Sequence, residues 1–93
     1  MKLVWSSKFT RSARKLTRHK QELLEQIDAA LAKLEEEPYH PKLRTHKLSG
    51  DFEGYWACSA GYDIRIVFEF VRPRKGAGME IHLLNIGTHD EVY

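Results

Sequence analysis

Five residues in the second half of the sequence are of types that could transfer protons or hold an anion: His46, Asp63, Arg65, His89 and Tyr93. A histidine can serve as general acid or general base because its pKa lies near neutrality. A guanidinium offers a planar set of N–H donors that suits a carboxylate or a phosphate. If Asp63 and Arg65 lie on one strand, their side chains share a face about 6.6 Å apart. With a histidine arriving from the preceding loop, these residues could form one site.

Each of these residues also has a purely structural explanation. A histidine in a loop is most often polar surface, and Asp63 could be a turn residue at the start of a strand. Arg65 could form a cross-strand salt bridge with Glu80. Tyr93 ends the sequence, and chain ends are often loosely held. His82 lies inside a predicted strand and is interpreted as structural. The residue pattern alone therefore does not decide whether the other residues form a functional site.

The elements that would position these residues begin with a loop and a β-hairpin between residues 44 and 71. Gly50 and Gly54 indicate a turn, and Tyr55–Ser59 reads as a short strand. Ala60 and Gly61 predict a tight connection to a strongly alternating second strand. One face of that strand would carry Ile64, Ile66, Phe68 and Phe70, and the other Asp63, Arg65, Val67 and Glu69.

A helical hairpin is expected before this sheet. Lys2–Trp5 reads as a short strand, and Ser6 or Ser7 can cap a helix from about Lys8 to Leu16. That helix places Phe9, Ala13 and Leu16 on one stripe. After a bend at 17–20, a second helix is predicted to run to about Glu35, where a Pro-containing segment ends it. Its predicted core stripe is Leu23, Leu24, Ile27, Ala30, Leu31 and Leu34.

A last strand, Met79–Ile86, follows the flexible basic connection Arg72–Gly78. Strict alternation would place Met79, Ile81 and Leu83 on one face and Glu80, His82, Leu84 and Ile86 on the other. The order is then a strand, two helices and at least three antiparallel strands. This order predicts an α+β fold, with the helical hairpin packed on one face of a small, twisted, mostly antiparallel sheet.

Composition is typical of one globular domain spanning residues 1–93, with 42% hydrophobic and 30% charged residues. No apolar run approaches the roughly 20 residues that a membrane helix needs, and no signal peptide is recognisable. The lone cysteine, Cys58, excludes an internal disulfide and is interpreted as a small strand residue. The expected location is therefore the cytoplasm.

The net charge of +2 conceals an uneven distribution. Residues 1–21 hold seven basic residues and no acid, whereas residues 22–37 hold six acids and one lysine. Basic residues return near Arg44 and again at 72–75. Such blocks favour a surface that faces a polyanion, although a charged face can also be simply solvated.

Three stretches carry a resemblance to a known family: Leu48–Trp56, Ser59–Phe68 and Ile86–Tyr93. Together they resemble the RelE/ParE superfamily of bacterial toxins from type II toxin–antitoxin systems. The likeness covers essentially the whole chain. A histidine before the Leu-x-Gly motif and the Gly-Thr-His ending are most similar to the YafQ branch. The sequence departs from that branch at Ala57 and Ser59, where YafQ-like proteins carry an acid and a second histidine.

The resemblance implies a ribosome-dependent endoribonuclease that cleaves messenger RNA. RNA supplies its own nucleophile, the 2′-hydroxyl, so no cofactor or metal is expected. His46 and His89 would transfer protons, Arg65 would hold the scissile phosphate, and Asp63 would orient a histidine or act as a second base. Tyr93 would stack on, or hydrogen-bond to, a displaced base.

The same resemblance implies a cognate antitoxin, the ribosome and mRNA as partners, without a membrane. A ParE-like toxin that binds and poisons DNA gyrase is the alternative, and a noncatalytic RNA-binding domain is a third. The residues expected to face the ribosome's RNA are Lys8, Arg11, Arg14, Lys15, Arg18, Arg44, Lys47, Arg72, Arg74 and Lys75.

Overall fold

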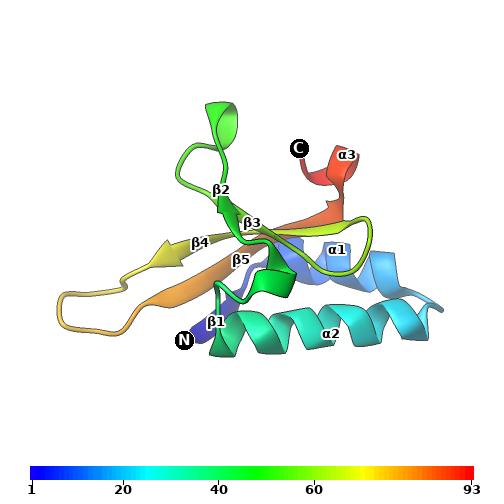
Figure 1. Ribbon diagram of the computed structural model, residues 1–93, viewed down its shortest axis with the longest axis horizontal. Helices are drawn as coiled ribbons and strands as arrows, with labels where there is room; N and C mark the ends of the chain where they lie inside the picture. Colours follow the sequence, from blue (N-terminus) through cyan, green and yellow to red (C-terminus); the bar gives the residue numbers. More distant parts are fainter.

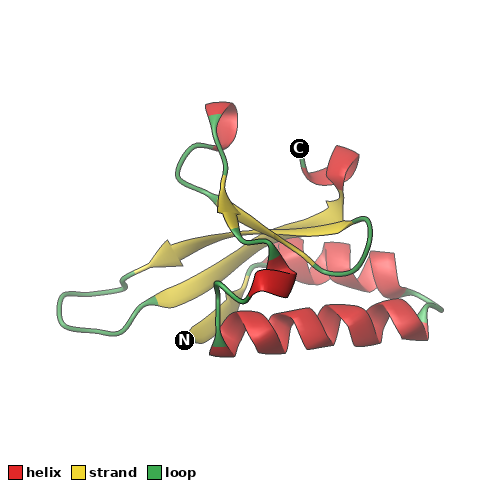
Figure 2. Cartoon of the chain, viewed as in Figure 1, coloured by secondary structure: helices red, strands yellow, loops and turns green.

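Two layers make up the computed structural model, which describes residues 1–93: a mixed sheet, and a pair of helices across one of its faces (Figures 1 and 2). The sheet order is β1-β5-β4-β3-β2, with β1 parallel to β5 and every other pair antiparallel. The predicted α+β fold is therefore confirmed. The strands are β1 (Lys2–Trp5), β2 (His46–Lys47), β3 (Trp56–Ser59), β4 (Ile64–Val71) and β5 (Glu80–Thr88).

The helical hairpin consists of α1 (Ser7–Thr17) and α2 (Gln21–Glu36). Ser6 begins α1 as predicted, because its hydroxyl accepts a hydrogen bond of 3.0 Å from the backbone N–H of Phe9. Neither helix is long and apolar enough to cross a membrane. Three short helical turns complete the chain: η1 (Pro41–Leu43), η2 (Gly50–Phe52) and α3 (His89–Val92).

The core lies between the helices and one face of the sheet. Phe9 and Leu34 contribute fully buried side chains from the helices, and Ile66, Phe68 and Leu83 from the strands. Leu24 was predicted to join the α2 stripe, but 37% of it is exposed. Its position lies at the edge of the apolar stripe of α2.

A bulge in β5 corrects the predicted faces of that strand. Val67 pairs with Asn85, whereas the next residue, Phe68, pairs with Leu83, so Leu84 is an extra residue on β5. An extra residue inverts the alternation on one side of the bulge. Ile86 therefore enters the core, at 3% exposed, and its predicted place on the face of Glu80 and His82 was wrong.

The face of the sheet opposite α1 and α2, called here the second face, is covered only at one end. There α3 turns back over β5 and buries Val92, while η2 rises beyond β2 on the same side (Figure 1). Val67 points to this face and is also buried. The β4–β5 hairpin extends in the opposite direction, at the far end of the sheet (Figure 1).

Candidate active site

A shallow pocket of about 440 Å³ lies between β2, η2 and α3 on the second face of the sheet. Four of the five predicted catalytic residues line it, and they come from separate parts of the chain. His46 belongs to β2, Arg65 to β4 and His89 to α3, while Tyr93 follows α3. Lys47, Leu48, Ser49 and Phe52 complete the lining.

Strand register explains why the pocket is open above Arg65. Arg65 pairs with Ser59 on one side and with Gly87 on the other. In the next row, His46 pairs with Ala57. Directly opposed residues of a sheet point to the same face, so only small side chains of β3 stand between the imidazole and the guanidinium. Ala57 and Ser59 are the positions at which the sequence departs from the YafQ pattern.

His46 is held by the backbone two residues before it. Its Nδ1 lies 2.8 Å from the carbonyl oxygen of Arg44. A carbonyl oxygen only accepts, so Nδ1 carries the proton and donates it. In the neutral ring Nε2 is then free to accept a proton. Arg44 has φ +52°, the left-handed conformation that turns its carbonyl toward the histidine.

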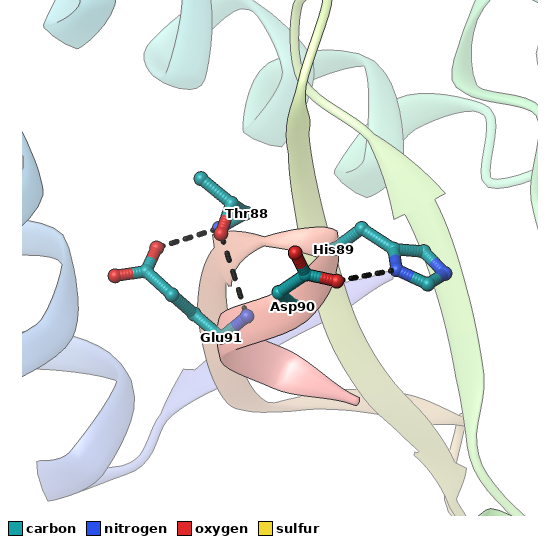
Figure 3. Close-up of polar contacts among 4 residues, drawn as sticks. All are labelled: Thr88, His89, Asp90 and Glu91. Atoms are coloured by element: carbon teal, nitrogen blue, oxygen red, sulfur yellow. Dashed lines mark hydrogen bonds and ion pairs between the residues drawn. The ribbon is translucent and has the colours of Figure 1, made fainter.

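His89 is positioned by the cap of α3. The Thr88 hydroxyl accepts from the N–H of Glu91, and the Glu91 carboxylate accepts from the N–H of Thr88 at 2.8 Å. Figure 3 shows Glu91 turned back to Thr88 while His89 points away from it. The hydrogen bond from the Thr88 backbone N–H is the main reason that the pKa of the Glu91 carboxyl is lowered. His89 Nδ1 lies 3.5 Å from the Asp90 carboxylate.

Gly87 allows α3 to turn back this tightly. A Cβ at position 87 would lie 3.0 Å from both Cβ and Oε1 of Glu91. Any side chain there would push against the capping carboxylate. In the Gly87-Thr88-His89 sequence, Gly87 thus permits the close approach, Thr88 caps α3, and His89 supplies the side chain that lines the pocket.

Tyr93 packs into the site rather than hanging free. Its ring makes edge contacts with Phe52, at 5.9 Å between centroids, and with His89, at 4.7 Å. Burial raises the pKa of the Tyr93 phenol, and the nearby Arg65 cation offsets part of that effect. Tyr93 is 38% exposed, so part of the residue stays accessible to a ligand.

Arg65 has no carboxylate partner. Its Nη1 donates to the carbonyl oxygens of Ile64, at 3.1 Å, and Tyr62, at 3.5 Å. The salt bridge with Glu80 is not formed, because Glu80 pairs with Val71 at the other end of β4 and its carboxylate contacts His82. The positive charge of Arg65 therefore remains available to an anionic ligand.

Asp63 is the predicted residue that the structure does not bring to the histidines. It lies before β4, in the Gly61–Asp63 connection, so its predicted place on the strand was wrong. The backbone N–H of Ala60 donates to the carbonyl of Ile64 at 2.9 Å and closes this loop. Asp63 lines an adjacent hollow on the other side of Arg65.

The predicted RNA-facing cations lie on the surface, but they form separate groups. Lys47 lies in the pocket and Arg44 in the adjacent hollow. Lys8 and Lys15 of α1 flank a groove whose far side includes Glu91 of α3. The hairpin cations 72–75 lie at the other end of the sheet. The expected site residues did not include Phe52, which contacts Tyr93, or Lys42 and Tyr62 of the adjacent hollow.

No cluster of three or more His, Cys, Asp or Glu side chains is arranged to hold a metal ion. The pocket brings together two imidazoles, a guanidinium and a phenol. This set can donate and accept protons beside a group that binds a phosphate.

The fold is that of known bacterial toxins. The chain superposes on a YoeB/ParE toxin from Agrobacterium tumefaciens with TM-score 0.76 and 20% identity, over 96% of this chain and 99% of that one. YafQ from E. coli strain BL21(DE3) gives TM-score 0.76 and 14% identity, over 98% and 96%. The YoeB–YefM complex from Staphylococcus aureus gives TM-score 0.72 and 12% identity, over 96% of this chain and 97% of that one.

These likenesses define the class: a small α+β protein with the YafQ/YoeB toxin fold. Residues 1–93 match the family described as the bacterial toxin of type II toxin–antitoxin system, YafQ. The chain therefore belongs to the YafQ toxin family. No curated protein sequence matches it significantly.

Proposed function

We propose that this toxin is a ribosome-dependent endoribonuclease that cleaves messenger RNA by attack of the RNA's own 2′-hydroxyl. The observation that carries the proposal is the single pocket that gathers His46, Arg65, His89 and Tyr93. Membership of the YafQ family supports the same reaction class. Asp63 has no proton-transfer role in this proposal, because it lies outside the pocket.

His46 is the general base. Its Nδ1–H is engaged by the Arg44 carbonyl, so Nε2 presents the lone pair that removes the 2′-hydroxyl proton. The 2′ oxygen then attacks the adjacent phosphorus, and the bond from phosphorus to the 5′ oxygen breaks. One product ends in a 2′,3′-cyclic phosphate and the other in a 5′-hydroxyl.

Arg65 and His89 serve the other side of the reaction. Negative charge grows on the non-bridging oxygens, and the unpaired Arg65 guanidinium can donate two parallel hydrogen bonds to them. His89 protonates the departing 5′ oxygen. The exposed part of the Tyr93 ring stacks on a base displaced from the message.

The partners follow from the surface and the family. The exposed cations of α1 and of the pocket rim contact ribosomal RNA and mRNA. An antitoxin protein neutralises the toxin, which is supported by the family description and by the similar YoeB–YefM complex.

Primer extension on ribosome-bound message, treated with purified protein, tests this function. The expected result is codon-phased breaks with 2′,3′-cyclic phosphate ends, which disappear when a 2′-deoxynucleotide occupies the cleavage position. Intact message together with inhibited DNA supercoiling by gyrase would instead support the ParE-like alternative. Intact message with tight ribosome binding would support a noncatalytic RNA-binding toxin.

A further inference from the structure

A second hollow, of about 540 Å³, adjoins the active-site pocket and shares Arg65 with it. Its other walls come from η1 and from the β3–β4 connection. It lies on the other side of the Arg65 guanidinium from the histidines of the active-site pocket. The lining residues are Lys42, Arg44, Ser59, Gly61, Tyr62, Asp63 and Arg65.

The charges of this hollow favour a phosphate-containing ligand. Lys42, Arg44 and Arg65 supply three cations against one carboxylate, that of Asp63. None of the three forms a salt bridge. The ion pairs of the structure are all between a histidine and a carboxylate. Unpaired cations that converge on a concave surface attract anions.

An aromatic ring stands at the rim. Tyr62 is 98% exposed, yet its loop is well held by the hydrogen bond between Ala60 and Ile64. Gly61, at φ +88°, makes the turn, and a Cβ there would lie 2.7 Å from Oε1 of Gln26 on α2. The loop thus rests on the helix layer and presents Tyr62 outward.

We propose that this hollow binds the nucleotide next to the scissile phosphate, with Tyr62 stacked on its base and Arg44 and Lys42 on its phosphate. A basic groove combined with an exposed aromatic ring is the usual arrangement for single-stranded RNA. The assignment rests on the proposed nuclease function and extends it by a second subsite.

Asp63 then reads the base instead of taking part in proton transfer. Its carboxylate can only accept hydrogen bonds when ionised. Adenine, cytosine and guanine each carry an exocyclic amino group that can donate to it, whereas uracil offers only its ring N3–H, which lies between two carbonyl oxygens that repel a carboxylate. The subsite therefore prefers amino-bearing bases to uracil.

Binding of 2′-O-methyl hexanucleotides tests the subsite apart from catalysis, because these RNAs lack the attacking hydroxyl. Fluorescence anisotropy would give Kd for mixed, all-adenine, all-cytosine and all-uracil sequences. Tyr62→Ala should weaken binding of the mixed sequence about 5- to 30-fold, whereas Tyr62→Phe keeps the stacking face and stays within about twofold.

Two further variants separate phosphate from base recognition. Arg44→Gly suits the left-handed backbone at φ +52° and removes the whole side chain with its charge while the backbone carbonyl stays. The slope of log K against log salt should therefore fall by about 0.7. Asp63→Asn should reduce or reverse the preference over uracil, which we expect to be about 2- to 10-fold. Lys33→Ala, on the acidic helix α2, is the charge-matched control and should change neither quantity.

Unchanged Kd in Tyr62→Ala, or no binding by the wild-type protein, would overturn the subsite. The nuclease proposal has its own readout in cleavage of ribosome-bound message. A protein that binds hexanucleotides through Tyr62 but leaves that message intact keeps the RNA-binding hollow. It loses the nuclease function and, with it, the placement of that hollow beside a scissile phosphate. One that cleaves normally with Tyr62→Ala and unaltered break sites loses the subsite alone.

Discussion

The imidazole of His46 donates from Nδ1 to the carbonyl oxygen of Arg44, 2.8 Å away, and both residues are exposed. This hydrogen bond joins the two subsites: the Arg44 backbone fixes the tautomer of the proposed base, and its side chain lines the neighbouring hollow. Arg44 has an uncommon left-handed backbone at this point. Its carbonyl therefore serves the proposed catalytic site, and its guanidinium serves the proposed subsite.

Replacing either histidine should remove cleavage but not the fold. His46→Ala and His89→Ala are each expected to slow single-turnover cleavage of ribosome-bound message by about 10²- to 10⁴-fold. Both side chains are exposed, so the melting temperature should barely change. His19→Gly is the matched control, since His19 is exposed with φ +59° and lies in the α1–α2 connection. Full growth arrest by a His46→Ala, His89→Ala double mutant would contradict the assignment.

Arg65→Lys distinguishes a phosphate clamp from a surface charge. Lysine keeps the charge but loses the planar fork, so cleavage should fall about 10- to 1,000-fold, or roughly 1.4–4 kcal/mol. Stability should hardly change, because Arg65 has no carboxylate partner. Single-turnover kinetics would measure the effect, and a wild-type rate would remove Arg65 from the site.

Ribosome affinity should weaken steeply with salt, because cations that bind phosphates release counterions. Replacing Lys8 and Lys15 by Ala should reduce the slope of log K against log salt by about one for each phosphate that is no longer neutralised. Lys33→Ala changes the net charge on the acidic helix and should leave the slope unchanged. Affinity that is insensitive to salt between about 50 and 200 mM would count against the basic α1 surface.

The cap of α3 should fail in acid. Bonds from Thr88 lower the pKa of Glu91 below its ordinary 4.5. The ionised carboxylate therefore stabilises the folded state at pH values above that ordinary pKa, and this contribution is lost as pH falls through the lower, folded pKa. The Thr88 amide resonance in an NMR titration should follow this transition. A midpoint at or above the ordinary value would show that the cap does not form in solution.

Cys58 should be inert in the folded protein. Burial raises the pKa of its thiol to about 12, so the reactive thiolate is essentially absent near neutrality. The contribution of the protonated thiol to stability is complete below the unfolded pKa of 9.0 and is lost as pH rises through about 12. Iodoacetamide should label Cys58 only in denaturant, and rapid labelling of native protein would refute its buried place in β3.

The sequence determined the layers of this protein and most of its site residues. Helical spacing of Phe9, Ile27 and Leu34 and alternation from Ile64 to Phe68 are local patterns, and burial of apolar area enforces them. Four of the five predicted catalytic residues line one pocket. The residue pattern suggested a cluster of a histidine, Asp63 and Arg65, and the family resemblance assigned His89 and Tyr93 to the same site.

Only the tertiary structure decided the rest. The bulge at Leu84 returns Ile86 to the core, and such an extra residue depends on strand pairing rather than on local alternation. The tight Gly61–Asp63 loop takes Asp63 off the strand and into the hollow with Tyr62. The proton on Nδ1 of His46 follows from a carbonyl that faces it only because Arg44 adopts a left-handed backbone. Register, loop closure and backbone handedness depend on contacts between distant segments, which a linear pattern does not contain.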